Sequence, residues 1–233
     1  MADLRVATIN AKGTAFPVRF MMKRRQRRRP DVVATQELYR LASTVDRLFP
    51  TWRNTGFLRG ASDMRRGSKD NPIFTRRGLV NLGEMIVIGS KASTPERLAP
   101  DRFIHVSAFL HDVGPTAVIN IHPHAATMGH ARRVDRANET ARFIEILKDV
   151  IRFWRNNGFH VVVVGDGNWR PSADSPDWQD LAEMLRQLRM EYHFHGIDFA
   201  ACTGGLEIAR VRTYSRKRVR SDHPGLLVDF RLA

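Results

Sequence analysis

Polar side chains able to bind a cation or exchange a proton recur where short apolar segments of this sequence begin or end. One such residue on its own is most simply a turn former or a hydrogen-bonded structural residue. A whole set of them indicates a functional site, because sheet scaffolds carry functional groups at strand ends and in the adjoining loops. The carboxylates, amides and imidazoles in question are Asn10, Glu37, His122, Asp166, Asn168, Asp198, Asp222 and His223.

The apolar segments around these residues predict a protein with more strands than helices. Strands are expected over residues 4–9, 31–36, 83–88, 103–110, 117–121, 161–164, 197–201, 209–213 and 226–230. Amphipathic spacing predicts helices over 138–157 and 178–188 and a further helix within 19–29, whereas the polar, basic segment 53–78 is typical of a loop. The strands come in clusters, which favours two packed sheets flanked by helices over a doubly wound parallel sheet.

The composition is that of a positively charged globular protein. The 233 residues include 38 Lys and Arg against 24 Asp and Glu, a net charge of +14, and 42% of them are hydrophobic. The single cysteine, Cys202, excludes an internal disulfide and a Cys-rich zinc site. Neither a signal peptide nor an apolar run of the roughly 20 residues that span a bilayer is found. We therefore expect a cytoplasmic protein with no membrane partner, folded as a single domain over residues 1–233.

Six segments, in this order along the chain, resemble the endonuclease/exonuclease/phosphatase superfamily, which has the DNase I-like fold. They are RVATIN (5–10), PDVVATQE (30–37), VINIH (118–122), VGDGN (164–168), IDF (197–199) and SDHP (221–224). The resemblance implies an α/β fold of the α+β kind, a four-layer α/β/β/α sandwich of two packed mixed sheets with its site at one edge. It also implies phosphoester hydrolysis assisted by a divalent cation, usually Mg²⁺, for which Mn²⁺ could substitute.

The resemblance further implies a set of residues around the cation. Glu37 would supply a carboxylate to Mg²⁺, a hard cation that prefers oxygen ligands. Asn10 would hold the metal or a phosphate oxygen beside it, and Asp222 would add a second carboxylate to the metal region. The cation would then act as a Lewis acid on the phosphate and on its leaving oxygen.

The remaining roles that the resemblance implies concern proton transfer and charge stabilisation. His223 would be either a general base or a residue that polarises the phosphate, oriented by Asp198 through its other ring nitrogen. Asp166 would orient or deprotonate the attacking water. Asn168 would donate a hydrogen bond to the transition state, and His122 would lie near the leaving group.

Positive charge close to these residues favours a nucleic-acid substrate, because polyanions bind basic surfaces through several phosphate contacts. A basic cluster lies directly before Ser221, and we expect its loop to overhang the catalytic edge. A second basic segment spans residues 19–29, and either segment could instead be a solvated face without a partner. The cluster consists of Arg210, Arg212, Arg216, Lys217, Arg218 and Arg220.

The function expected from the sequence is a Mg²⁺-dependent endonuclease of low sequence specificity, with DNA favoured over RNA and no obligate protein partner indicated. One alternative is a phosphatase or phosphodiesterase for a small or lipid phosphate on the same fold, whose activity would survive neutralisation of the basic cluster. The other is a catalytically weak, basic nucleic-acid-binding protein, which would bind DNA without cleaving it.

Overall fold

The computed structural model of the chain describes residues 3–23, 29–38, 41–55, 72–88, 103–123, 133–168 and 176–233. The strands are β1 (Leu4–Asn10), β2 (Val32–Gln36), β3 (Trp52–Thr55), β4 (Ile73–Arg76), β5 (Val80–Ile88), β6 (Phe103–His111), β7 (Gly114–Ile121), β8 (His160–Asp166), β9 (Glu191–His195), β10 (Asp198–Thr203), β11 (Leu206–Tyr214) and β12 (Gly225–Leu232). The helices are α1 (Phe16–Met22), α2 (Ala42–Leu48), α3 (Arg133–Asn156), α4 (Pro176–Gln187) and α5 (Arg216–Val219).

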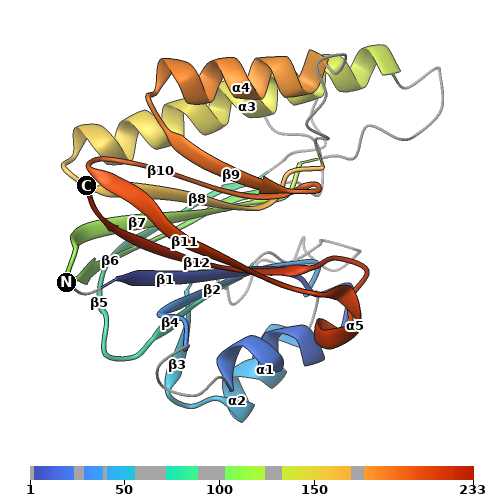
Figure 1. The fold of residues 1–233 in the computed structure, drawn as a ribbon, viewed down its shortest axis with the longest axis vertical. Coiled ribbons are helices and arrows are strands. Elements are labelled where there is room, and N and C mark those ends of the chain that lie inside the picture. Colours follow the sequence, from blue (N-terminus) through green and yellow to red (C-terminus); the bar gives the residue numbers. More distant parts are fainter. Residues whose placement is uncertain are drawn as a thin grey trace.

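The strands form two six-stranded sheets that pack face to face (Figure 1). The first sheet has the order β11-β12-β1-β2-β4-β3, and the second has the order β5-β6-β7-β8-β10-β9. Figure 1 shows α1, α2 and α5 on the outer side of the first sheet and α3 and α4 on the outer side of the second. The four-layer α/β/β/α sandwich expected from the sequence is therefore confirmed.

Each sheet contains a parallel pair of strands among antiparallel neighbours. In the first sheet β1 runs parallel to β2, and in the second β7 runs parallel to β8. The carboxyl ends of parallel strands meet at the same edge of a sheet, and an antiparallel neighbour begins at that edge. This arrangement fixes where the polar residues at the strand ends come together.

Buried apolar side chains fill all three spaces between the four layers. On β8, Val162 and Val164 face the first sheet, whereas Val161 and Val163 pack against the α3 and α4 side. A strand buried on both faces needs no polar alternation, which explains its run of four valines. Met21 of α1 lies in the third cluster, on the outer side of the first sheet. None of the helices in the described ranges is both long and apolar enough to cross a bilayer.

The assignment of residues 53–78 to a loop is wrong at both ends of that segment. Residues 52–55 and 73–76 form β3 and β4, which pair with each other, and β4 continues the sheet through β2. The strands are only four residues long and carry charged residues, so a hydrophobic pattern hardly develops. Their buried side chains, Trp52 and Phe74 among them, pack on the outer side of the first sheet in the same cluster as residues of α1 and α2. Residues 56–71 lie outside the described part, as do residues 24–28 of the basic segment.

Three further elements were not expected from the sequence, namely α2, β9 and α5. β9 exposes three of its five residues and pairs with β10 at the edge of its sheet, so it lacks the apolar run that marks a central strand. By contrast, α3 ends at Asn156 and Gly158 follows with φ of 83°, in agreement with the helix stop expected near residue 157.

Candidate active site

Four of the candidate residues lie at the carboxyl ends of the two parallel strand pairs. Asn10 ends β1 and Glu37 follows β2, whereas His122 follows β7 and Asp166 ends β8. Because the two sheets are packed together, these four ends meet across the layer between them. Asn10 Nδ2 donates a hydrogen bond of 3.0 Å to Asp166 Oδ2, which joins the first sheet to the second at this edge.

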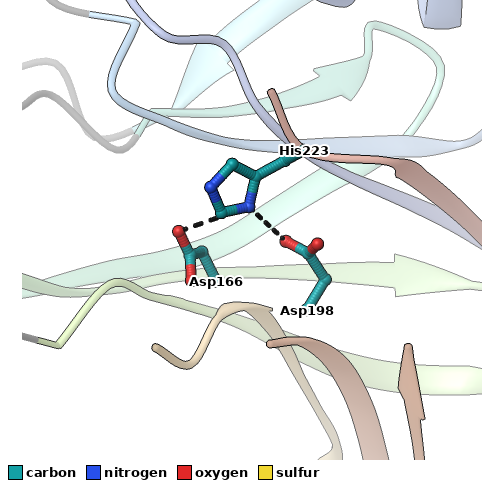
Figure 2. Close-up of side chains that lie close together, drawn as sticks. All are labelled: Asp166, Asp198 and His223. Atoms are coloured by element: carbon teal, nitrogen blue, oxygen red, sulfur yellow. Dashed lines mark hydrogen bonds and ion pairs between the residues drawn. The ribbon is translucent and has the colours of Figure 1, made fainter. Parts of the chain in front are cut away.

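Asp198 and His223 reach the same edge at the amino ends of antiparallel strands. Asp198 begins β10 directly opposite Asp166 on β8, and His223 lies two residues before β12. His223 Nδ1 is 3.3 Å from Asp198 Oδ1 and 3.6 Å from Asp166 Oδ2 (Figure 2). One imidazole nitrogen therefore faces two carboxylates from the opposite sheet.

The surroundings of His223 favour its protonated form. Burial disfavours the imidazolium, but the hydrogen bond with Asp198 and the negative charges of Asp166, Asp198 and Asp222 outweigh it and raise the pKa of His223 to about 9. The imidazole thus carries a positive charge at neutral pH. A charged imidazole can polarise a phosphate oxygen, but it has no lone pair with which to accept a proton.

Asp166 is the residue to which the other side chains of the site converge. Burial raises its pKa to about 6, although the charge of His223 and the hydrogen bond from Asn10 oppose the shift. Its Oδ1 accepts a hydrogen bond of 3.0 Å from the backbone N–H of Asn168, which fixes the carboxylate plane. A carboxylate with a pKa near 6 is ionised at neutral pH and is a stronger base than an ordinary aspartate.

Close contact between β7 and β8 brings His122 and Asp166 together. Gly165 has φ of 152°, and a Cβ atom at this position would lie 2.1 Å from the carbonyl oxygen of Ile121. His122 and Asp166 directly follow these two residues. His122 Nε2 lies 3.6 Å from Asp166 Oδ2 and 3.5 Å from Glu37 Oε1, with the imidazole buried between the two carboxylates.

Glu37 reaches the site from a left-handed backbone conformation with φ of 53°. Such a conformation is uncommon for a residue other than glycine, and it turns the chain immediately after β2. The backbone N–H of Gly13 donates a hydrogen bond of 2.7 Å to the Glu37 carbonyl and ties this turn to the loop after β1. The Glu37 carboxylate is 18% exposed, against 2% for Asp166 and 3% for Asp198, so it is the most accessible of the three.

Asn168 and Asp222 lie at the rim of the site. The Asn168 side chain donates a hydrogen bond of 2.9 Å from Nδ2 to the carbonyl of Pro123, and the backbone of Asn168 has φ of 53°. Asp222 Oδ2 forms an ion pair of 2.7 Å with Lys12 Nζ, and both side chains are largely exposed. Burial works against ionisation of Asp222, but the hydrogen bond with Lys12 prevails and lowers the pKa of Asp222.

The basic cluster before Ser221 is not a single loop, so that part of the expectation is wrong, although Arg216 and Lys217 do lie beside the site. Arg210 and Arg212 lie on β11, and the next three basic residues form α5. Arg212 Nη2 makes an ion pair of 2.9 Å with the buried carboxylate of Asp229 on β12, so its charge is already compensated. The sequence pattern also predicts a strand over residues 209–213, and the structure agrees with this strand. Arg210 and Arg212 therefore cannot belong to a loop that overhangs the site.

A cavity of about 640 Å³ opens beside Asp198 and His223. It is lined by the turn between β9 and β10, the end of β11 and the start of α5. His195, Arg216 and Lys217 contribute side chains to this wall. The catalytic edge therefore continues into a hollow that carries positive charge.

Some residues that shape the site had no role in the sequence analysis. Ser221 Oγ donates a hydrogen bond of 2.7 Å to the Asn10 carbonyl and links the segment before His223 to the end of β1. Behind the site, Gln36 Nε2 donates to Asn120 Oδ1 at 2.6 Å, and Asn120 Nδ2 donates to the Thr35 carbonyl at 2.8 Å. The signal for the last two was present, since Gln36 and Asn120 are amides in otherwise apolar strands.

Two places at this edge offer oxygen donors to a divalent cation: the carboxylates of Asp166 and Asp198 around His223, and the more accessible carboxylate of Glu37, which follows β2 beside the end of β1 at Asn10. Ligand atoms of Asp166, Asp198 and His223 lie within 4.8 Å of one another. Asp198 Oδ2 is buried and has no hydrogen-bond partner within the part of the chain that the structure describes. Carboxylate oxygens are the donors that hard cations such as Mg²⁺ and Mn²⁺ prefer. A bound cation would also offset the negative charge that these carboxylates bring together.

No protein-family model and no curated protein matches the sequence, but solved structures do. The catalytic domain of human Nocturnin, solved with a sulfate anion, has a TM-score of 0.70 and 15% identity over 99% of this chain and 95% of its own. An endonuclease/exonuclease/phosphatase family protein from Bacteroides thetaiotaomicron has a TM-score of 0.69 and 16% identity, covering 98% and 97%. TDP2 from Caenorhabditis elegans has a TM-score of 0.64 and 15% identity, covering 99% and 75%.

These comparisons establish the fold of the chain. It has the architecture of endonuclease/exonuclease/phosphatase family proteins over its whole length, as the six sequence segments predicted. The identities are low, so the chemistry of this chain has to be argued from its own residues.

Proposed function

We propose that the protein is a divalent-metal-dependent phosphodiester hydrolase and, more specifically, a DNA endonuclease of low sequence specificity. The observation that carries the proposal is the convergence of Asn10, Glu37, Asp166, Asp198 and His223 from both sheets onto one edge. These residues supply, in one place, oxygen ligands for a cation, an ionised carboxylate and a charged imidazole. Metal-assisted hydrolysis of a phosphodiester can use all three functions.

We assign the cation to Glu37 and Asn10 rather than to the space between Asp166 and Asp198. His223 already occupies that space and is held there as an imidazolium by the two carboxylates. Glu37 carries the more accessible carboxylate, whereas Asp222 is paired with Lys12. When bound, the cation would act as a Lewis acid that offsets negative charge on the phosphate and on the leaving oxygen.

Asp166 serves as the base in this proposal. Its ionised carboxylate accepts a proton from water as the water oxygen forms a bond to phosphorus, and the bond from phosphorus to the leaving oxygen breaks. Its pKa of about 6 makes it a better proton acceptor than an exposed aspartate while leaving it ionised at neutral pH. Asn10 and the backbone of Asn168 hold the two carboxylate oxygens in place.

His223 polarises the phosphate rather than accepting the proton. Its Nδ1 is directed to Asp198, so Nε2 is the nitrogen that would donate to a phosphate oxygen. The charge of the imidazolium stabilises the negative charge that develops in the transition state. His122 lies between Glu37 and Asp166 and acts as a positioning residue for both carboxylates. The side-chain amide of Asn168 has two hydrogens, and one of them is donated to the Pro123 carbonyl. Only the second hydrogen would be available to a phosphate oxygen.

Charge favours DNA as the substrate over a small phosphate ester. The chain carries a net charge of +14, and Arg216 and Lys217 line the cavity beside His223. Such a distribution raises the local concentration of a polyanion and makes binding strongly dependent on salt. A small phosphate ester would need one or two of these charges.

Plasmid nicking tests the proposal. The wild-type protein should convert supercoiled plasmid to the open circle with Mg²⁺ or Mn²⁺ and should be inactive with EDTA. Glu37→Ala and His223→Ala should each remove the activity, and Arg152→Ala, on the distant face of α3, should keep it. Cleavage by the two site variants would reveal a contaminating nuclease. If the wild-type protein hydrolysed a phosphoinositide or a chromogenic phosphomonoester but did not nick plasmid, it would be a phosphatase and not a nuclease. If it bound DNA without hydrolysing any of these substrates, it would be a nucleic-acid-binding protein.

A further inference from the structure

A second feature of the fold lies directly beside the proposed active site, on the surface formed by α1 and α5. The two helices pack against each other on the outer side of the first sheet (Figure 1). The surface, termed here the arginine face, is joined to the site by the hydrogen bond from Ser221 Oγ to the Asn10 carbonyl. Its exposed basic residues are Arg19, Lys23, Arg216, Lys217, Arg218 and Arg220.

Two guanidinium groups of the arginine face are held against aromatic rings. Arg220 lies 4.4 Å from the centre of the Phe16 ring, and Arg218 lies 5.8 Å from the centres of both Phe20 and Tyr214. Stacking of this kind restricts the long side chain without neutralising its charge. The guanidinium edges stay free to donate paired hydrogen bonds to a phosphate, and less entropy is lost on binding.

The charges of the arginine face differ from those of the opposite helical layer. On α3 and α4, Lys148, Arg152 and Arg186 each form an ion pair with an acidic residue three positions earlier. Within the described ranges, none of the six basic residues of the arginine face has such a partner. Local ion pairs therefore do not offset the positive charge of the arginine face, as they do for Lys148, Arg152 and Arg186.

The arginine face is also continuous with the cavity beside His223. Arg216 and Lys217 belong to α5 and line that cavity, and Arg218 and Arg220 continue the same segment toward α1. A chain whose scissile phosphate lies at His223 would bring its neighbouring phosphates over α5. Arg220 is not among the residues that line the cavity, and its guanidinium covers the Phe16 ring.

We propose that the arginine face binds the phosphodiester backbone of the DNA substrate on one side of the scissile bond. This inference rests on the proposed function and extends it, since it makes binding dependent on the length of the strand. An anionic membrane is a poorer fit, because membrane-binding surfaces combine basic residues with apolar side chains that insert. Of the large apolar side chains exposed in the described residues, only Phe16 lies on α1 or α5, and Arg220 covers its ring.

The test compares two double variants that lose the same charge. Arg218→Ala with Arg220→Ala removes two guanidinium groups from the arginine face, and Arg152→Ala with Arg186→Ala removes two from α3 and α4. Binding of a fluorescent duplex of about 20 base pairs is measured in EDTA over a range of salt concentrations. The first variant should bind about tenfold or more weakly, with a salt slope smaller by about 2, whereas the second should keep the wild-type slope.

A second measurement separates binding from chemistry. With Mg²⁺, the Arg218→Ala, Arg220→Ala variant should lose much more activity on long DNA than on bis(p-nitrophenyl) phosphate, because that diester has no neighbouring phosphates. Its KM for long DNA should rise about tenfold with little change in kcat. The Arg218→Lys, Arg220→Lys variant keeps the charge but loses the planar pair of donors. Its KM for long DNA should therefore lie between the values of the wild type and of the double alanine variant.

Several results would overturn the proposal. If both alanine variants showed the same decrease in the salt dependence of DNA binding, the effect would come from net charge and not from the arginine face. If the Arg218→Ala, Arg220→Ala variant kept the wild-type salt dependence, the arginine face would not contact the DNA backbone. Stronger dependence on the arginine face for RNA or for phosphatidylserine vesicles than for DNA would assign the surface to another partner. If the wild-type protein cleaves no phosphodiester but its binding of DNA depends on the arginine face, the hydrolase is refuted while the backbone contact stands.

Discussion

His223 Nδ1 and Asp198 Oδ1 lie 3.3 Å apart, although the two residues belong to different sheets. Asp198 begins β10 in the second sheet, and His223 precedes β12 in the first, so the pair exists only when the two sheets are packed. The contact fixes the orientation of the imidazole and favours its charged form. The protonation of His223 therefore depends on a carboxylate that tertiary structure alone brings to it.

Asp198→Asn should lower the pKa of His223. The substitution keeps the shape of the side chain and removes one of the negative charges that raise the pKa to about 9. The remaining burial then disfavours the imidazolium, so the value should fall toward its ordinary 6.5. A titration of the imidazole ring signals by NMR in metal-free protein measures the shift. Glu145→Gln on the exposed surface of α3 is the control, and an unchanged pKa in Asp198→Asn would contradict the pairing.

Without metal, the stability of the folded protein should decrease as the pH rises through the range in which His223 loses its proton. Its pKa is about 9 in the folded state and 6.5 as a model value, so the folded state binds more protons between these two pH values. Stability falls with pH wherever the native state holds the extra proton. Urea unfolding in EDTA at several pH values should show the difference between wild type and His223→Gln shrinking from pH 6.5 to pH 9. A difference that grew over this range would reverse the sign of the argument.

Asp166 should add a second, lower pH range in which the stability of the folded protein decreases as the pH rises. Burial raises its pKa from 3.8 to about 6, so the folded state also binds more protons between these values. The carboxylate is thus least costly to bury when protonated, and folding loses stability as the pH rises from 3.8 to 6. Asp166→Asn should flatten this part of the stability curve. A curve for Asp166→Asn identical to the wild type over this window would show that the carboxylate titrates normally.

Glu37→Gln should weaken binding of the divalent cation by at least about a hundredfold, because an amide oxygen carries no net charge and even outer-shell substitutions cost 10–100-fold. Calorimetric titration with Mn²⁺ measures the affinity directly and does not require turnover. Glu145→Gln should bind as the wild type does. If Asp198→Asn weakened binding and Glu37→Gln did not, the cation would lie among Asp166, Asp198 and His223, where ligand atoms also come within 4.8 Å.

The position of four site residues at or next to strand ends followed from local pattern. Short apolar runs end at Asn10, Gln36, Ile121 and Asp166, and these runs are the central strands of the two sheets. A hydrophobic run marks a strand wherever both its faces are buried, and the polar residue after it marks the edge. That these ends meet at one edge was implied by the resemblance of the six segments to the endonuclease/exonuclease/phosphatase superfamily.

The pairings around the site could not be predicted in the same way. Lys12 meets Asp222 and Arg212 meets Asp229 because β12 pairs with both β1 and β11, and a strand register is not visible in sequence. The short strands β3 and β4 were missed because charged neighbours interrupt their apolar pattern. The sequence also placed positive charge near the site without showing which arginines are already neutralised.

Gly165→Ala should destabilise the protein and also reduce its activity. A Cβ atom at this position would lie 2.1 Å from the Ile121 carbonyl oxygen, so β7 and β8 would have to separate. Overpacking of this kind costs about 1–3 kcal/mol, and it would move His122 and Asp166 apart at the same time. Urea unfolding gives the loss of stability, and plasmid nicking gives the loss of turnover. Gly78→Ala is the matched control, since nothing lies within 4 Å of a Cβ atom there, and equal effects of the two substitutions would show that the close contact of β7 and β8 does not position the site.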